Sequence, residues 1–145
     1  IINYCLEHNI GNIVLGKNKG FQQKSDLGKV NNQIFVQMPF YKLQQKLEYQ
    51  CKIYGIDMVE QEESYTSKAS FWGKDDIPVY GDSKQCSFSG KRIKRGLYQT
   101  SNGILLNADV NGALNILRKS NVVSLNGLYS RGELNTPIRI RVIKN

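Results

Sequence analysis

The stretch that decides the fold lies near the C-terminal third of the chain and reads Asn107-Ala108-Asp109-Val110-Asn111-Gly112-Ala113-Leu114-Asn115-Ile116-Leu117-Arg118-Lys119. Four apolar residues follow Asp109 at offsets of one, four, five and eight, which is the spacing of one face of a helix. They are Val110, Ala113, Leu114 and Leu117. The pattern therefore predicts a helix that begins at Asp109 and has these four side chains on its apolar face.

Asp109 would place its carboxylate at the positive end of this helix. Two roles fit the position. A capping carboxylate accepts hydrogen bonds from free backbone N–H groups and contributes about 1 kcal/mol, whereas a catalytic carboxylate holds a divalent metal over a phosphate. If Asp109 is considered without its neighbours, the capping role is favoured. Asn107, Asn111 and Asn115 shift the balance toward chemistry, because a purely structural helix has no need of a polar stripe at four-residue spacing.

The composition favours a polyanionic partner. Twenty Lys and Arg against twelve Asp and Glu give a net charge of +8 and a pI near 9.4, as in many nucleic-acid-binding proteins. Ribosomal proteins share this balance, so charge favours nucleic acid over a membrane only weakly. No run approaches the ~18 apolar residues of a membrane span, and no signal-like start is present.

Cysteine usage bears on the compartment. Cys5, Cys51 and Cys86 are isolated and odd in number, which favours a reducing cytoplasm over a disulfide framework. The chain begins with Ile1 and not with Met, from which we expect a truncated reading frame or an excised piece of a longer protein.

The first part of the chain alternates helices and strands. Residues 1–8 have the pattern of a short helix, with His8 as a residue of the helix end. Residues 12–15 are predicted to form a short buried strand. Residues 18–32 are rich in Lys, Gln, Gly and Asn without periodicity, which predicts a mobile loop.

A second helix is predicted to open at Pro39-Phe40 and to close at Gly55, because apolar residues recur in it at four- and three-residue spacing. These residues, which form its predicted core face, are Leu43, Leu47, Cys51 and Tyr54. A strand over residues 56–59 follows and leads to Glu62 and Glu63. This order of elements predicts an α/β fold.

The densest positive cluster lies in residues 91–95 and is followed by Tyr98. Its members are Lys91, Arg92, Lys94 and Arg95. Cations beside an aromatic ring suit contact with phosphates combined with base stacking, but a solvated basic hairpin explains the cluster equally well. Lys68 adds positive charge, and Arg118 and Lys119 lie in the last turn of the final helix, where they also favour the helix dipole.

Three motifs at separate places in the chain point to one family. They are NADVNGALNI (residues 107–116), ESYTSK (residues 63–68) and GKRIKRGLY (residues 90–98). Together they resemble the C-terminal part of TnpB-type (OrfB) proteins, a transposon-associated group related to miniature RNA-guided nucleases. The resemblance extends roughly from Gly11 to Lys119. It implies an α/β fold, a partial RNase H-like (RuvC-like) domain with an inserted small β-rich ribbon that lacks zinc ligands.

The resemblance also implies catalytic residues. Asp109 falls on the third catalytic acid of the family's D-x-N-x-A-x-N-I motif. The second acid is a glutamate directly after the first strand, where this chain has Gly16-Lys17-Asn18. We expect Glu63 to be a relocated acid, with Glu62 as the second choice, so that Asp109 and Glu63 hold Mg²⁺. The alternative is that residues 61–63 form a solvated loop in a domain that no longer cuts.

Family members usually carry a zinc ribbon with two C-x-x-C knuckles in the inserted region. The corresponding positions here are residues 69–73 and 86–90, and only Cys86 is a cysteine. One thiolate cannot hold a structural zinc, which needs about four ligands. We therefore expect no zinc, and we expect Trp72 to pack where the ion would lie.

The resulting organisation has four parts: residues 1–63 as the second half of a RuvC-like core, residues 64–106 as a basic degenerate ribbon, residues 107–119 as the final helix, and residues 120–145 as a tail. The tail contains the alternating run Ile138-Arg139-Ile140-Arg141-Val142, which predicts a short strand.

By resemblance, the function is that of a C-terminal fragment of a metal-dependent, RNA-guided DNA endonuclease. Its partners would be DNA and a guide RNA, with no membrane involved, and the sequence does not fix an oligomeric state. The first catalytic Asp is not in this sequence, so we expect no cleavage by the chain alone. The rival hypothesis is a non-catalytic nucleic-acid-binding remnant. A basic ribosome-associated protein is a third and weaker one, because it leaves the shared motifs unexplained.

Overall fold

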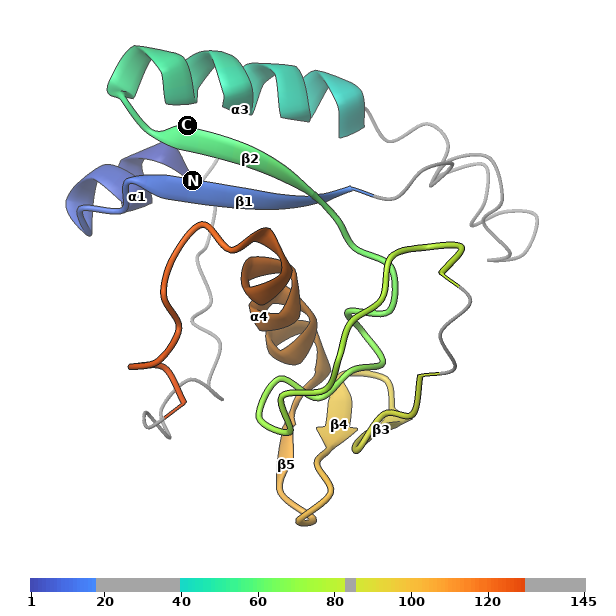
Figure 1. The fold of residues 1–145 in the computed structure, drawn as a ribbon. Coiled ribbons are helices and arrows are strands. Elements are labelled where there is room, and N and C mark those ends of the chain that lie inside the picture. Colours follow the sequence, from blue (N-terminus) through green and yellow to red (C-terminus); the bar gives the residue numbers. More distant parts are fainter. Residues whose placement is uncertain (18–39, 83–85, 130–145) are drawn as a thin grey trace. The chain divides into compact units, whose positions relative to one another are not determined.

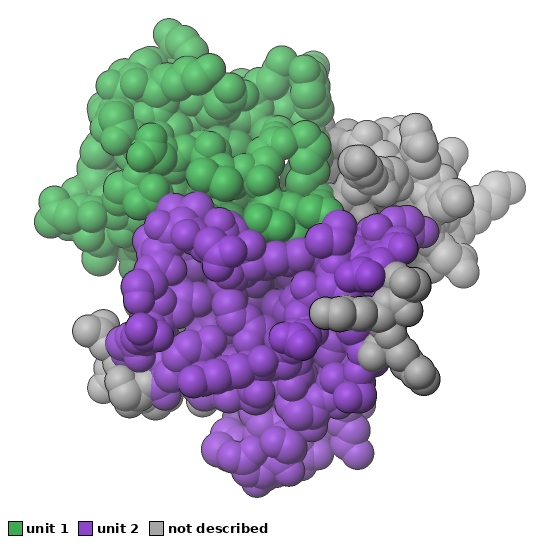
Figure 2. All heavy atoms as spheres, viewed as in Figure 1, with its two compact units in different colours: residues 1–62 green, residues 63–145 purple. Residues whose placement is uncertain are grey.

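The computed structural model describes residues 1–17, 40–82 and 86–129. The chain divides into two compact units, unit 1 (residues 1–62) and unit 2 (residues 63–145), which Figure 2 shows in different colours. The predicted loop over residues 18–32 and the predicted strand over residues 138–142 lie outside the described residues.

Unit 1 combines two helices with a small parallel sheet (Figure 1). Its elements are α1 (Ile2–Glu7), β1 (Asn12–Lys17), α3 (Phe40–Tyr54) and β2 (Asp57–Glu62). The two strands pair in parallel, with Gly16 opposite Gln61. The buried cluster consists of Cys5, Leu47, Cys51 and Ile56. The helices and strands predicted for this part of the chain are therefore confirmed, as is the place of His8 at the C-cap of α1. The predicted burial of residues 12–15 is not, because the described part of β1 is exposed at its ends and only half-buried between them.

The predicted core face of α3 is only half correct. Leu47 and Cys51 are buried, and Cys51 is only 1% exposed, whereas Leu43 is 53% and Tyr54 50% exposed. The described part of unit 1 has only a two-stranded sheet and the six-residue helix α1. These elements cover a narrow stripe of α3 and leave the two ends of the predicted apolar face uncovered.

Unit 2 contains an antiparallel sheet that leads directly into a helix. Its elements are β3 (Lys91–Lys94), β4 (Leu97–Gln99), β5 (Leu105–Asn107) and α4 (Ala108–Ser120), and the strand order is β3-β4-β5. Tyr98, Leu106 and Ala108 form its buried apolar cluster, against which Trp72 packs. Gly90 lies so close to the Tyr98 ring that a Cβ atom at position 90 would be 2.5 Å from it.

The buried face of α4 differs from the predicted one. The residues that α4 buries are Ala108, Asn111 and Asn115. The four predicted apolar residues are half-buried or, for Ala113, exposed. The helix therefore does form where the sequence predicts it, but it turns its amide stripe inward. Contrary to expectation, the amide stripe of this helix has a structural role, because Asn111 and Asn115 are buried.

The buried amides of α4 organise a segment without regular structure, residues 63–82. Asn111 accepts a hydrogen bond from the Phe71 backbone N–H through Oδ1 (3.0 Å) and donates to the Ala69 carbonyl through Nδ2 (2.8 Å). Asn115 donates to the carbonyls of Ala69 (2.7 Å) and Thr66 (2.9 Å). Buried backbone groups need such partners, and in this segment the helix side chains supply them.

The last turn of α4 continues this pattern with cations. Arg118 donates through Nη2 to the Asp75 carbonyl (2.6 Å). Lys119 donates through Nζ to the carbonyls of Ser64 (3.3 Å) and Pro78 (2.9 Å). The helix then ends at Asn121 in the left-handed conformation (φ 53°), a usual way to terminate a helix.

Taken together, the described residues form a mixed α/β structure with two small sheets. In the described ranges, no helix combines the length and apolar character that a membrane span requires.

Candidate functional site

The N-terminus of α4 presents Asp109 to solvent. Asn107 is the N-cap, and its side-chain oxygen accepts hydrogen bonds from the backbone N–H groups of Asp109 (2.9 Å) and Val110 (3.0 Å). The helix therefore begins at Ala108, one residue before the predicted start, and Asn107, two positions before Asp109, supplies the side-chain cap. Of the two roles considered for Asp109, capping is thus taken by Asn107. The Asp109 side chain is exposed, and its carboxylate has no hydrogen bond or ion pair with another described residue.

The other predicted acids are adjacent in the sequence but belong to different units. Glu62 ends β2 opposite Lys17. Glu63 is the first residue of unit 2, and its carbonyl accepts hydrogen bonds from the N–H (3.2 Å) and the hydroxyl (2.8 Å) of Thr66. These bonds fix the backbone of Glu63 in a turn. Whether its carboxylate acts together with Asp109 stays a prediction.

The position where the resemblance expects a glutamate faces an amide. Gly16 of β1 is the register partner of Gln61 in β2, so the residue opposite this position is uncharged. Within the described ranges, no group of three or more His, Cys, Asp and Glu is placed to hold a metal ion. The described residues therefore do not form a complete metal site, and Mg²⁺ binding by Asp109 and Glu63 stays a prediction.

A single carboxylate joins the two segments that the resemblance assigns to the zinc knuckles. Oδ2 of Asp75 accepts hydrogen bonds from the backbone N–H groups of Ser70 (2.7 Å) and Ser89 (3.0 Å). We call these two hydrogen bonds the Asp75 bridge. The two segments also approach each other closely at Gly73, because a Cβ atom there would lie 2.3 Å from the Ser89 hydroxyl oxygen. Trp72 packs edge-on against Phe71, with ring centroids 5.1 Å apart.

The basic cluster occupies an edge strand and the turn after it. We call Lys91, Arg92, Lys94 and Arg95 the basic edge. All four are exposed, and none makes an ion pair with a described residue. From Ser83 to Ala108 the sequence contains no acidic residue. The positive charge of the basic edge is therefore not neutralised by neighbours in the chain, which suits a polyanionic ligand.

Tyr98 does not belong to this exposed surface. Its side chain is 0% exposed, and its hydroxyl donates to the Lys68 carbonyl (2.8 Å). Burial raises the pKa of Tyr98 above its usual value, the negative charge of Asp75 raises it further, and a hydrogen bond with Ser70 opposes both effects. The predicted stacking of Tyr98 on a base is therefore wrong, because the ring is a core residue of unit 2.

Arg118 and Lys68 also differ in their availability. The Arg118 guanidinium is half-buried, donates to the Asp75 carbonyl and lies 5.9 Å from the centroid of the Phe71 ring. These contacts give Arg118 a structural role, and its contact with nucleic acid stays a prediction. Lys68 is exposed, and its amine lies 5.9 Å from the Tyr65 ring centroid, so it remains a candidate contact.

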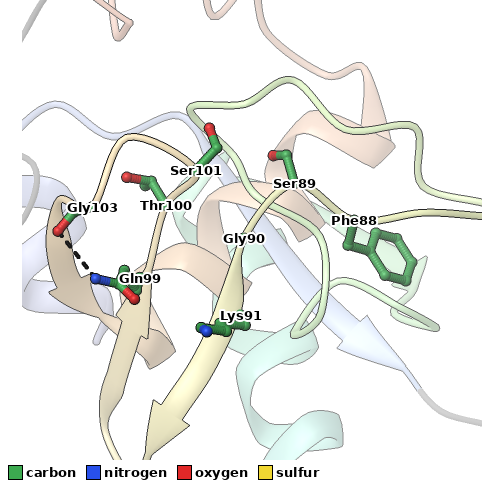
Figure 3. Close-up of a pocket in the computed structure, with 8 residues that line it drawn as sticks. All are labelled: Phe88, Ser89, Gly90, Lys91, Gln99, Thr100, Ser101 and Gly103. Atoms are coloured by element: carbon green, nitrogen blue, oxygen red, sulfur yellow. Dashed lines mark hydrogen bonds between the residues drawn. The ribbon is translucent and has the colours of Figure 1, made fainter.

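Sequence reasoning missed a hollow beside the basic edge, which Figure 3 shows. It has a volume of about 410 Å³, within the range of about 300–1,000 Å³ that is usual for ligand pockets. Its lining consists of Phe88, Ser89, Gly90, Lys91, Gln99, Thr100, Ser101 and Gly103. The polar run over residues 99–103 was the sequence signal that could have indicated this hollow. It connects β4 to β5, and its first residue, Gln99, is the register partner of Lys91.

Comparison with known proteins gives a family. The model of the Cas12f1-like, TNB domain family matches residues 40–116, which is more than half of the 145 residues. The match begins with α3, includes the basic edge and the hollow, and ends within α4 after Asp109. No curated protein matches the chain. The chain therefore belongs to the Cas12f1-like TNB domain family, which relates it to the TnpB- and Cas12-type nucleases.

Proposed function

We propose that the chain is the C-terminal part of a TnpB-like, RNA-guided DNA endonuclease with a partial RNase H-like fold, and that unit 2 contacts nucleic acid through the basic edge. The observation that carries the proposal is the exposed, unpaired charge of this edge inside the region that matches the family. DNA and a guide RNA are the partners that such a protein requires.

The geometry of β3 supports phosphate contact. All four residues of the strand are exposed, and among the described residues β3 pairs only with β4. Lysines on an edge strand also protect a sheet from pairing with other chains, which would explain one or two of these charges. Four cations within five residues, with no acid from Ser83 to Ala108, are more than the protection of a sheet edge requires. They fit a positively charged surface that binds a nucleic-acid backbone.

Asp109 is the proposed metal-binding acid of this part of the protein. Two observations support it: Asn107 does the capping, and the Asp109 carboxylate is exposed beside the positive end of α4. In an intact enzyme, Mg²⁺ would activate a water and stabilise the leaving oxygen. Because the described residues contain no metal-binding group of three, we expect no cleavage by this chain alone.

The second candidate function is a nucleic-acid-binding module without catalysis. Two observations favour it. Gly16 stands where the resemblance expects a glutamate, with Gln61 as its register partner. The Asp75 bridge joins the two segments that the resemblance assigns to the zinc knuckles. Both candidates share the basic edge, so binding is tested first and cleavage second.

The binding test compares two double variants that each remove two positive charges. Arg92→Ala/Lys94→Ala changes the basic edge, and Lys42→Ala/Lys46→Ala changes exposed lysines of α3 in unit 1. Affinity for a fluorescent single strand is measured by anisotropy at several salt concentrations. We expect the first variant to reduce the salt slope by about 1.4, at ~0.7 per phosphate contact, and the control to leave it nearly unchanged. Equal losses in both variants would contradict the proposal.

The cleavage test uses the chain as it is. We expect no Mg²⁺-dependent nicking of DNA by the purified protein, and therefore no difference between it and Asp109→Ala. Robust nicking that Asp109→Ala abolishes would show that the chain has a complete site. In a full-length protein that contains this chain, Glu63→Gln separates the two candidates: it abolishes cleavage but not binding if Glu63 is the relocated acid.

A further inference from the structure

The sequence contains three asparagines that are followed directly by glycine. They are found in the pairs Asn102-Gly103, Asn111-Gly112 and Asn126-Gly127. An asparagine in this position is chemically labile, because the backbone nitrogen of the next residue can attack its side-chain carbonyl carbon. Glycine favours the attack, since it has no side chain and leaves the backbone the most freedom. The setting of each pair in the fold then decides whether the reaction occurs.

The pair Asn111-Gly112 is protected by its place in the fold. Asn111 is 0% exposed and lies inside α4, where Oδ1 accepts from the Phe71 N–H and Nδ2 donates to the Ala69 carbonyl. Attack by the Gly112 nitrogen would require the carboxamide to leave both partners and the helical backbone to open. Asn111 therefore serves as an internal standard that is expected not to react.

The pair Asn102-Gly103 has the opposite setting. It lies in the turn between β4 and β5, and residues 101–104 are all exposed. Ser101 and Gly103, the two neighbours of Asn102, line the hollow beside the basic edge (Figure 3). The Gly103 N–H donates to the Thr100 carbonyl (3.0 Å), so the attack requires this turn to open. Hydrogen bonds of exposed turns open at low cost, and solvent replaces them without unfolding unit 2.

A neighbouring hydroxyl activates the Asn102 carboxamide. Oγ of Ser101 donates a hydrogen bond to Oδ1 of Asn102 (2.9 Å). This bond draws electrons from the carbonyl carbon and stabilises the negative charge that develops on the oxygen during the attack. Asn126 lacks such an activator. It is exposed in a turn, but Leu125 precedes it, and its carboxamide receives no hydrogen bond from a described residue.

The charge around the turn acts in the same direction. Lys91 lines the same hollow as Ser101 and Gly103, and no acidic residue occurs from Ser83 to Ala108. Nearby positive charge lowers the cost of the anionic nitrogen and the anionic oxygen that form during the attack. The turn therefore combines an open setting, a hydroxyl donor and a favourable electrostatic field.

We propose that Asn102-Gly103 is a self-modifying site, at which Asn102 is converted to aspartate and isoaspartate with the help of the Ser101 hydroxyl. The Gly103 nitrogen loses its proton to solvent and forms a bond to Cγ of Asn102. The bond from Cγ to Nδ2 breaks, and Nδ2 takes up a proton and leaves as ammonia. Water then opens the resulting succinimide ring at either carbonyl. One water molecule enters for each ammonia released, and no oxidant or reductant is needed.

The reaction changes the charge of this part of unit 2. Both products place a carboxylate beside the hollow, whose lining has none, and isoaspartate also lengthens the backbone of the turn by one methylene. The positive charge next to the basic edge thus declines with the age of the protein. This inference does not depend on the proposed function, since it concerns a reaction of the chain with water.

The test incubates the folded full chain in a mildly alkaline buffer made with heavy-oxygen water, which labels each carboxylate that the reaction forms. Tandem mass spectrometry then assigns the label to each asparagine, and an isoaspartate methyltransferase detects the isomer. We expect label at Asn102 and none at Asn111. Ser101→Ala should slow the reaction of Asn102 about three- to tenfold, as the loss of one hydrogen bond in the transition state predicts, and should leave the rate at Asn126 unchanged.

Two controls connect the effect of Ser101 to the folded turn. Ser87→Ala makes the same change at an exposed position outside the turn and should leave the rate at Asn102 unchanged. In urea, where the turn is absent, Ser101→Ala and the wild type should react at equal rates. Trp72 fluorescence shows that each variant is folded in buffer.

Three outcomes would overturn the proposal. The first is an unlabelled Asn102 in the folded wild type after an incubation that labels it in urea. The second is a rate at Asn102 that Ser101→Ala leaves unchanged. The third is a Ser101 effect of the same size in urea, because the hydroxyl would then act without the geometry of the turn.

Discussion

The two units of this protein stabilise their interiors by different chemistry. The buried cluster of unit 1 is apolar and consists of Cys5, Leu47, Cys51 and Ile56. In unit 2, two of the largest fully buried side chains are the amides Asn111 and Asn115. Unit 1 is therefore held by burial of apolar surface, whereas in unit 2 side chains of α4 also satisfy the backbone of an irregular segment.

In unit 2, the largest effect is expected from Asn111→Leu, which fills the same space with an apolar side chain. The Phe71 N–H would lose its acceptor in a buried place, while the Ala69 carbonyl would keep the bond from Asn115. A buried donor without a partner costs about 1–3 kcal/mol, and lost packing adds to this. We expect the free energy of unfolding to fall by about 2–4 kcal/mol, measured by urea titration with the fluorescence of Trp72, the only tryptophan.

A matched change tests whether position 111 is special. Asn102→Leu makes the same replacement in an exposed turn of unit 2, where a substitution is expected to change stability by less than about 0.5 kcal/mol. If Asn111→Leu were as stable as the wild type, unit 2 would be held by burial of apolar surface like unit 1. The proposed difference between the two interiors would then be wrong.

This difference explains which parts of the fold the sequence predicts. The helices and strands of unit 1, and the existence of α4, follow from hydrophobic spacing. The inward face of α4 does not, because Asn111 and Asn115 are buried only when residues 63–82 offer unpaired backbone groups to them. The Asp75 bridge cannot be predicted from the sequence either. Its donors are the backbone N–H groups of Ser70 and Ser89, and nearly every residue has such a group.

The candidate site divides in the same way. The motif around Asp109 and the charge of the basic edge are properties of the sequence, and the structure places both at the surface. The environment of Tyr98 and Arg118 depends on contacts with Lys68 and Asp75, which lie 30 and 43 positions away in the chain. Local patterns contain no record of such contacts, so the sequence alone does not predict that the Tyr98 ring is buried.

Asp75→Ala should have the next largest effect, because it removes both hydrogen bonds of the Asp75 bridge. Hydrogen bonds to a charged acceptor contribute about 1.5–3 kcal/mol each when buried, but Asp75 is half-buried and solvent screening reduces this contribution. We expect a loss of about 1–3 kcal/mol in the urea titration, and a smaller loss for Asp75→Asn, which keeps a neutral acceptor. Similar stability of Asp75→Ala and the wild type would contradict a structural role of the bridge.

Metal removal provides a second test of the same region. If the Asp75 bridge does the work of a zinc ion, EDTA should leave the Trp72 unfolding curve of the wild type unchanged, and added Zn²⁺ should not stabilise it. A shift to lower urea concentration with EDTA would show instead that unit 2 depends on a metal.

Tyr98→Phe should have a moderate effect that depends on pH. At neutral pH the variant loses the hydrogen bond to the Lys68 carbonyl, at a cost of about 1 kcal/mol. The folded-state pKa of Tyr98 is raised, so between the unfolded value of about 10 and the higher folded value the folded protein binds more protons. Stability is thus fully present below pH ~10 and falls as pH rises through the folded pKa.

Phenylalanine cannot ionise, so the stability difference between Tyr98→Phe and the wild type should narrow above pH ~10. Unfolding curves measured with Trp72 at neutral pH and in steps up to strongly alkaline pH give this difference. Because other tyrosines and lysines titrate in both proteins, only the difference between the curves is informative. A constant difference at all pH values would show that the phenol is not buried as the neutral form.

The smallest effect is expected in unit 1, from Leu43→Ala. Hydrophobic spacing assigns Leu43 to the core, but it is 53% exposed, so its truncation should cost less than about 0.5 kcal/mol. Leu47→Ala, one turn along the same helix, removes a buried side chain and should cost about 2–5 kcal/mol. In a Cys86→Ser background, the reactivity of the buried thiols Cys5 and Cys51 with a thiol reagent in urea reports on unit 1 alone. Equal costs for Leu43→Ala and Leu47→Ala would mean that the apolar core of unit 1 extends over the whole face that the spacing predicts, because only a covered Leu43 would lose as much buried surface as Leu47.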